Sequence, residues 1–183
     1  MIRISILTLK DHIKSVKKDS FSVLRNFGKR KQLFTENQLK IIVNSLVVYK
    51  LEYCNALYSG INERQFDELQ RIQNAAAKTI LGLHKLYDHL GESLKQLHWL
   101  PIKLRMTYKI LLIFYKCMAT KYLVSMISYT SYNHFLNLKE SPTNTIAGHK
   151  RWDGLPIEIK SCSSISSFKT ALKTYLFREA YHD

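Results

Sequence analysis

The chain has 183 residues, of which 46% are hydrophobic, and it contains only six Gly and three Pro. That length can bury a core without disulfides or metals, and the scarcity of turn residues argues against a turn-rich all-β fold. The 28 Lys and Arg against 14 Asp and Glu give a net charge of +14, which favours a polyanionic partner over a merely soluble basic surface.

The positive charge is concentrated in the two end regions. Residues 1–34 hold nine basic and two acidic residues, net +7, and residues 101–183 hold twelve and five, also net +7. Residues 35–100 hold seven of each and are neutral. Nucleic acid is therefore a more natural partner than a membrane, and no small-molecule substrate is indicated.

The cysteines and the hydropathy of the sequence indicate the cellular compartment in which the protein resides. The cysteines are odd in number, far apart and without a Cys-x-x-Cys pair, which is typical of structural thiols in a reducing compartment: Cys54, Cys117 and Cys162. The N-terminal stretch is charged too early for a signal peptide, and the longest uncharged run, 122–138, is too polar to span a membrane. We expect an intracellular protein, nuclear or cytoplasmic, without membrane contact.

The first predicted helix covers residues 11–27. Apolar residues recur there at helical spacing, Asp11 can cap the start, and Gly28 can end it. Basic residues occupy the other side and continue into the turn GKRK at 28–31. Together they form the first candidate phosphate-binding patch: Lys14, Lys17, Lys18, Arg25, Lys29, Arg30 and Lys31.

Helical signals continue through the centre of the chain. Segment 35–60 opens with Thr35 and, three residues later, Gln38, which is a capping-box pattern. Segment 62–82 is the clearest helix, because Asn62 suits its N-cap and Gly82 its end.

The stretch LHWLPIKLRMTYKILLIFYK at 97–116 is predicted to be a corner between two helices. Pro101 suits the first turn of the second helix, and Trp99 and Leu100 would fill the joint. The second helix carries the second candidate phosphate-binding patch: Lys103, Arg105 and Lys109.

These elements predict a mostly α fold with little or no sheet. Residues 1–128 form the main helical region, residues 129–151 lose helical periodicity and are the predicted linker, and residues 152–183 form a C-terminal helical extension. Within the extension, Ser164 or Ser166 can cap the last helix.

No catalytic residue, metal site or cofactor is predicted. The sequence lacks a Gly-rich phosphate loop and a His-Glu-x-x-His motif, and its aspartates are scattered. The histidines His84, His89 and His98 would need a distant further ligand to hold a metal, so capping or turn roles are favoured. Cys54 has no assigned base and is expected to be a small buried side chain rather than a nucleophile.

Four strings occur together in a fixed order: YCNALYSG at 53–60, LQRIQNAAAKTILG at 69–82, YDHLGESLKQLHWLPIKLRMTYKILLIFYK at 87–116 and LPIEIKSCSSISSFKTALKTYLF at 155–177. They resemble the region after the polymerase palm in reverse transcriptases of non-LTR (LINE-type) retrotransposons, of the jockey and chicken-repeat kind. The resemblance spans roughly residues 7–181.

The resemblance implies a thumb-like helical bundle, which in such enzymes grips the template–primer, followed by a C-terminal extension. RNA or an RNA–DNA hybrid is the partner it implies. The family's catalytic Tyr-x-Asp-Asp loop lies upstream of the matching region, and this chain contains no such pair. The stretch between Tyr129 and Trp152 is also shorter than is usual in the family, and it ends in AGHKRWDG where the family has Ala-Pro-x-x-Trp-Asn. The expectation is therefore a non-catalytic fragment.

Two other interpretations stay open. The chain can be a helical protein-interaction module, whose apolar faces would pack on a palm domain in the resembled enzymes. It can also be a decayed reading frame without a selected role, which the apparent internal shortening favours.

Overall fold

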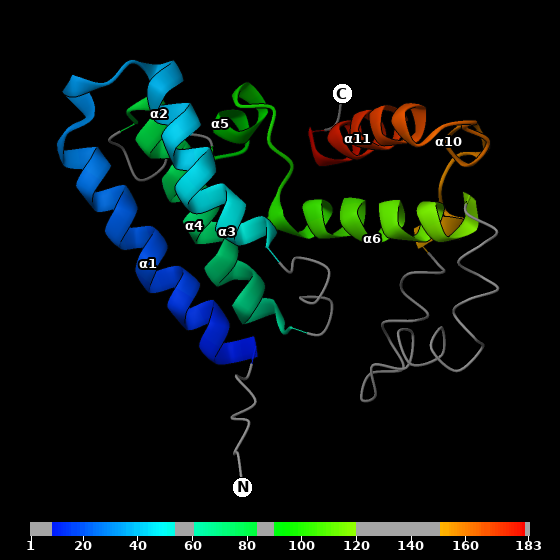
Figure 1. Ribbon diagram of the computed structural model, residues 1–183, viewed down its shortest axis with the longest axis horizontal. Helices are drawn as coiled ribbons and strands as arrows, with labels where there is room; N and C mark the ends of the chain where they lie inside the picture. Colours follow the sequence, from blue (N-terminus) through cyan, green and yellow to red (C-terminus); the bar gives the residue numbers. More distant parts are fainter. Residues whose placement is uncertain (1–8, 54–60, 84–89, 120–150, 182–183) are drawn as a thin grey trace, which may run out of the picture. The chain divides into compact units, whose positions relative to one another are not determined.

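The computed structural model describes residues 9–53, 61–83, 90–119 and 151–181 (Figure 1). This part of the chain is overwhelmingly helical and includes no strand, which confirms the predicted mostly α fold class. The chain divides into two compact units, residues 1–103 and 104–183. The predicted linker, 129–151, lies outside the described residues apart from Arg151, so that prediction stays a prediction.

Helix α1 (Leu9–Lys29) is longer than the sequence predicts at both ends. Asp11 lies in its first turn and does not cap it, although a carboxylate there still favours the positive end of the helix. Gly28 lies inside the helix and does not end it, because it does not adopt the positive φ of a left-handed cap. A 3₁₀ turn, η1 (Lys31–Leu33), follows.

The next rod consists of α2 (Glu36–Val43), the π-helical stretch η2 (Asn44–Val48) and α3 (Tyr49–Glu52). The predicted capping box is confirmed, since the Gln38 backbone N–H donates to Thr35 Oγ1 and the Thr35 backbone N–H donates to Gln38 Oε1. Residues 54–60, where the sequence places the end of this segment, lie outside the described residues.

The π-helical stretch has a reason in the spacing of the buried residues. Four core side chains recur at every fourth position: Leu39, Val43, Val47 and Leu51. A regular α-helix, with 3.6 residues per turn, would rotate each successive member of this set by about 40° away from the core. A π turn holds more residues and offsets that rotation, so all four side chains stay on one face.

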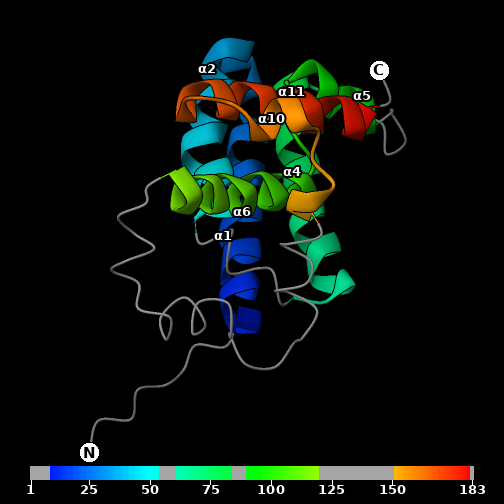
Figure 2. The ribbon, with the colours of Figure 1, turned by 90° about the vertical axis from the view of Figure 1, so that its right-hand side faces the viewer.

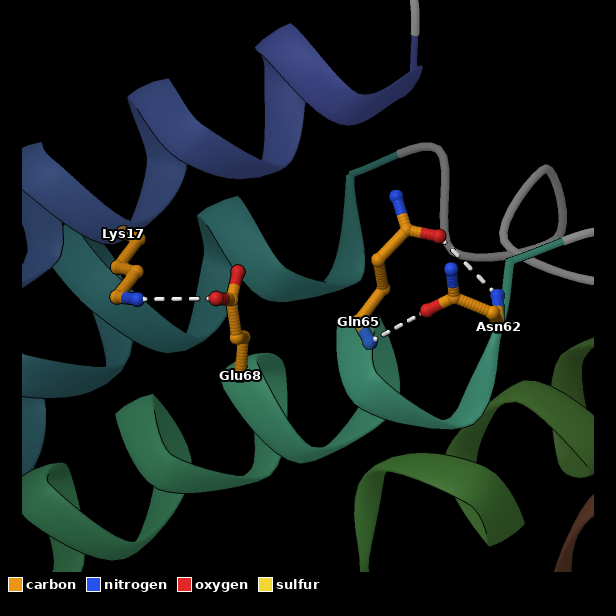
Figure 3. A network of polar contacts seen from close by, with 4 residues as sticks. All are labelled: Lys17, Asn62, Gln65 and Glu68. Carbon is orange, nitrogen blue, oxygen red and sulfur yellow. Dashed lines mark hydrogen bonds and ion pairs between the residues drawn. The ribbon is translucent and has the colours of Figure 1, made fainter.

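Helix α4 (Glu63–Leu81) is the centre of the first unit. It packs against α1, α2, η2 and α5 (Leu90–Gln96), as Figures 1 and 2 illustrate for α1. Its predicted ends are confirmed: Asn62 and Gln65 form a reciprocal capping box (Figure 3), and Gly82 closes the helix with a φ of +71°. Its core side chains include Leu69, Ile72, Ala76 and Ile80.

The predicted corner after α5 is also confirmed, because Trp99 and Leu100 are both buried. Its backbone is held by amide side chains of α4. Gln73 Nε2 donates to the Leu100 carbonyl at 2.8 Å, and the Ile102 backbone N–H donates to Gln70 Oε1 at 2.9 Å. The second bond satisfies one of the backbone donors that α6 (Ile102–Ala119) leaves open at its start.

The second unit begins in the first turn of α6 and includes α10 (Ile157–Lys160) and α11 (Ile165–Tyr181). Helices α6 and α11 run antiparallel and side by side (Figures 1 and 2). The rings of Tyr115 and Phe168 stack with their centroids 4.0 Å apart, and Tyr115 donates its hydroxyl to the Cys162 carbonyl. Ser164, one of the two predicted caps, accepts from the Ser167 backbone N–H at 3.1 Å.

Candidate nucleic-acid interface

The outer face of α1 carries a row of cations. The opposite face of the helix is anchored in the core by Ile13, Val16, Ser20 and Leu24. With 3.6 residues per turn, four basic side chains fall within an arc of about 60° and extend along about 22 Å of the helix. We call this set the basic stripe, and all of its members are exposed: Lys14, Lys18, Arg25 and Lys29.

The charges of the basic stripe are not neutralised locally. Within the described part of the chain, no ion pair involves any of its four side chains. Lys14 and Lys18 lie one turn apart, as do Arg25 and Lys29, so each pair places two cations about 6 Å apart along the axis. Asp11, in the first turn, lies about 60° from Lys14 around the axis and is an acidic residue on this face. Such a row can neutralise successive phosphates of one nucleic-acid strand.

Lys17 belongs to the predicted first patch but not to the stripe. Its Nζ lies 3.1 Å from Glu68 Oε1 of α4, and both side chains are partly buried (Figure 3). The pair lies at the margin where α1 meets α4. Because its charge already has a partner, Lys17 contributes to the packing of the two helices more than to phosphate contact.

The last two residues of the first patch lie beyond α1 and differ from each other. Arg30 is exposed and continues the positive surface past Lys29. The Lys31 side chain instead lies over Gly82, since a Cβ added there would come within 1.6 Å of Lys31 Nζ. Its ammonium therefore sits at the C-terminal end of α4, where the helix dipole favours a cation.

The second predicted patch is not brought together on one side of α6. Lys103 and Lys109 are separated by about 120° around the helix axis. Lys103 forms an ion pair with Glu63 and lies 5.6 Å from the centroid of the Phe66 ring, so its charge is shared with α4. Lys109 is exposed, whereas Arg105 is partly buried.

Arg105 also interacts electrostatically with Tyr181 within the second unit. Burial raises the pKa of the Tyr181 hydroxyl to about 12, although the nearby Arg105 guanidinium acts in the opposite direction. Burial also raises the pKa of Tyr108. Arg105 is thus part of the environment of the C-terminal helix, and Lys109 is the member of the second patch that is exposed and forms no ion pair within the described residues.

Lys10, which is not part of the predicted first patch, lies one helical turn before Lys14 and is exposed. At about 40° from Lys14 around the axis, it extends the basic stripe toward the N-terminal end of α1. Its spacing of four residues from Lys14 could have revealed it. The predicted helix begins only at Asp11, which excludes Lys10 from the face.

Other kinds of site have less support in the parts of the chain that are described. No group of three or more His, Cys, Asp or Glu side chains there could hold a metal ion. His84, His89 and Cys54, which the sequence singles out, lie outside those parts. None of the described helices combines the length and apolarity needed to cross a membrane.

Comparisons of the chain with protein-family models, with curated proteins and with solved structures found no match.

Proposed function

We propose that this chain is a non-catalytic fragment related to the reverse transcriptase of a non-LTR retrotransposon, and that it binds the phosphate backbone of RNA or of an RNA–DNA hybrid. The basic stripe is the observation that carries the proposal. Four exposed cations on one face of a packed helix, without ion-pair partners in the described residues, are an electrostatic footprint for a polyanion. The proposal includes no catalytic step.

The family part of the proposal rests on the four ordered sequence strings. Thumb regions of such enzymes hold a template–primer through its backbone, which needs cations and helix surfaces but no catalytic group. A helical chain with a one-sided row of Lys and Arg is compatible with that role. The protein-docking alternative predicts instead that binding depends on apolar side chains and survives high salt.

The proposal is tested by fluorescence anisotropy with a labelled RNA–DNA hybrid. The stripe variant replaces all four members of the basic stripe by Ala, which lowers the net charge from +14 to +10. A control variant lowers the charge by the same amount at exposed positions on α4 and α11: Arg64→Ala, Arg71→Ala, Lys169→Ala and Lys173→Ala. Circular dichroism establishes that both variants keep their helical content.

We expect the stripe variant to bind the hybrid at least about tenfold more weakly than the wild-type chain at low salt. The control variant should bind nearly as well as the wild type, because its lost charges are divided between two helices, two on each. Equal weakening in both variants would mean that net charge alone drives the association. A wild-type chain that is folded but does not bind would eliminate the proposed function.

A further inference from the structure

Two tyrosine rings stand exposed on α3 and at its end. Tyr49 is 67% exposed and Tyr53 is 61% exposed. The Tyr53 backbone N–H donates to the Tyr49 carbonyl at 2.9 Å, so the two residues are one helical turn apart. Their rings therefore project from the same side of the rod, opposite its buried residues Val47 and Leu51.

An ion pair places these rings relative to α1. Lys50, which follows Tyr49, lies 3.6 Å from Asp19 of α1. Helices α1 and α3 run in opposite directions (Figure 1), and η2 also contacts α1. In an antiparallel pair, the residues after Lys50 lie level with the residues before Asp19. Tyr53 is therefore on a level with the part of α1 that includes Lys14 and Lys18.

We infer that Tyr49 and Tyr53 form a stacking platform for the bases of a single-stranded nucleic acid whose phosphates lie along the basic stripe. This inference rests on the proposed function. Unpaired strands are commonly held by a positively charged track beside exposed aromatic side chains, on which successive bases stack. The basic stripe provides the track, and the two phenol rings provide exposed aromatic faces.

The charge argues for nucleic acid rather than protein as the occupant of this face. An apolar protein surface would gain from Ile41 and Leu46, which are also exposed on the rod, but it would not use the adjacent cations. A single strand uses both features at once. A single strand also suits this face better than a duplex does, because stacking on the tyrosines requires bases that are not paired with a partner strand.

The test compares a short thymidine oligonucleotide with an abasic oligonucleotide of the same length, which keeps the backbone but lacks the bases. We expect the wild-type chain to prefer the base-bearing strand by at least about fivefold. The variant Tyr49→Ala/Tyr53→Ala should lose this preference and still bind the abasic strand. The variant Tyr49→Phe/Tyr53→Phe, which keeps the aromatic faces, should retain it.

The outcomes separate this inference from the proposed function. Equal wild-type affinity for the two strands would overturn the stacking platform but leave the phosphate contacts standing. No binding to either strand would overturn the stacking platform, and loss of binding to the RNA–DNA hybrid as well would overturn the proposed function itself. A preference that persists in the Ala variant would place the base contacts elsewhere. If the Ala variant instead binds both oligonucleotides as the wild-type chain does, and sedimentation shows self-association of the wild-type chain that the variant lacks, the tyrosine face is a surface for contact with protein.

Discussion

Gln73 holds the joint between α4 and the corner that precedes α6. It is fully buried, donates to the Leu100 carbonyl, and accepts from Gln70 Nε2 at 2.9 Å. Gln70 in turn accepts from the Ile102 backbone N–H and donates to Asn74 Oδ1. The amide network therefore satisfies backbone groups of a corner that is otherwise lined by apolar side chains.

We predict that Gln73→Met lowers the free energy of unfolding by about 1–3 kcal/mol, because it keeps the side-chain volume but removes the buried hydrogen bond to the Leu100 carbonyl. Urea denaturation followed by circular dichroism measures the change. The matched control is Gln96→Met, at an exposed position of α5, which should change stability by less than about 0.5 kcal/mol. A wild-type midpoint for Gln73→Met would show that the network does not stabilise the corner.

Tyr181 makes the second unit sensitive to alkaline pH. Burial raises its pKa above the ordinary value of 10.0 to about 12, so the folded chain favours the neutral phenol. The stabilisation that this provides is complete below pH 10 and is lost as the pH rises through about 12. Tyr108, whose pKa burial also raises, acts in the same direction.

For Tyr181→Phe we expect a smaller decline of the melting temperature between pH 10 and 12 than in the wild-type chain. Scanning calorimetry at several pH values measures it, and Tyr49→Phe serves as the exposed control. Parallel declines in the wild type and in Tyr181→Phe would rule out a contribution from this hydroxyl.

Among the helices, the π-helical stretch is explained by the sequence pattern only once it is known which residues are buried. Removing one residue between Val43 and Val47 would leave buried positions spaced by four, three and four residues, which a regular α-helix places on one face. Ser45 is exposed and its hydroxyl donates only to the preceding turn, at the Ile41 carbonyl.

We therefore predict that deletion of Ser45 converts the rod to continuous α-helix and costs less than about 2 kcal/mol of stability. The comparison is deletion of Arg71, an exposed residue in the middle of α4, which would rotate the buried residues on one side of the deletion out of the core and unfold the first unit. Urea denaturation distinguishes the two. Equal loss of structure in both deletions would contradict this account of the π-helical stretch.

The helix ends and the ion pairs show which features can be predicted from the sequence and which cannot. Helix α4 is predicted at both ends because Asn62 and Gly82 act through local hydrogen bonds and backbone conformation. The ends of α1 are mispredicted because nothing local forces the chain to stop at Gly28. The ion pairs of Lys17 and Lys103 join residues 51 and 40 positions apart, so no local pattern separates these lysines from those of the basic stripe.

At the scale of the whole molecule, the described cations fall into three roles. Those of the basic stripe face solvent on one side of α1. Others are engaged within the fold, such as Lys50 with Asp19. Still others, such as Arg64 between acidic neighbours on α4, stand on surfaces of mixed charge. Among the described residues, the basic stripe is thus a one-sided row of exposed cations without ion pairs, and the proposed function depends on that row.

The salt dependence of binding tests most directly whether the four cations of the basic stripe contact phosphates. The dissociation constant for the labelled RNA–DNA hybrid is measured at several salt concentrations for the wild-type chain and for the stripe variant. Each lost phosphate contact reduces the slope of log affinity against log salt by about 1, so the stripe variant should lose about 3 to 4 units of slope. An unchanged slope, with the variant still folded, would contradict the claim.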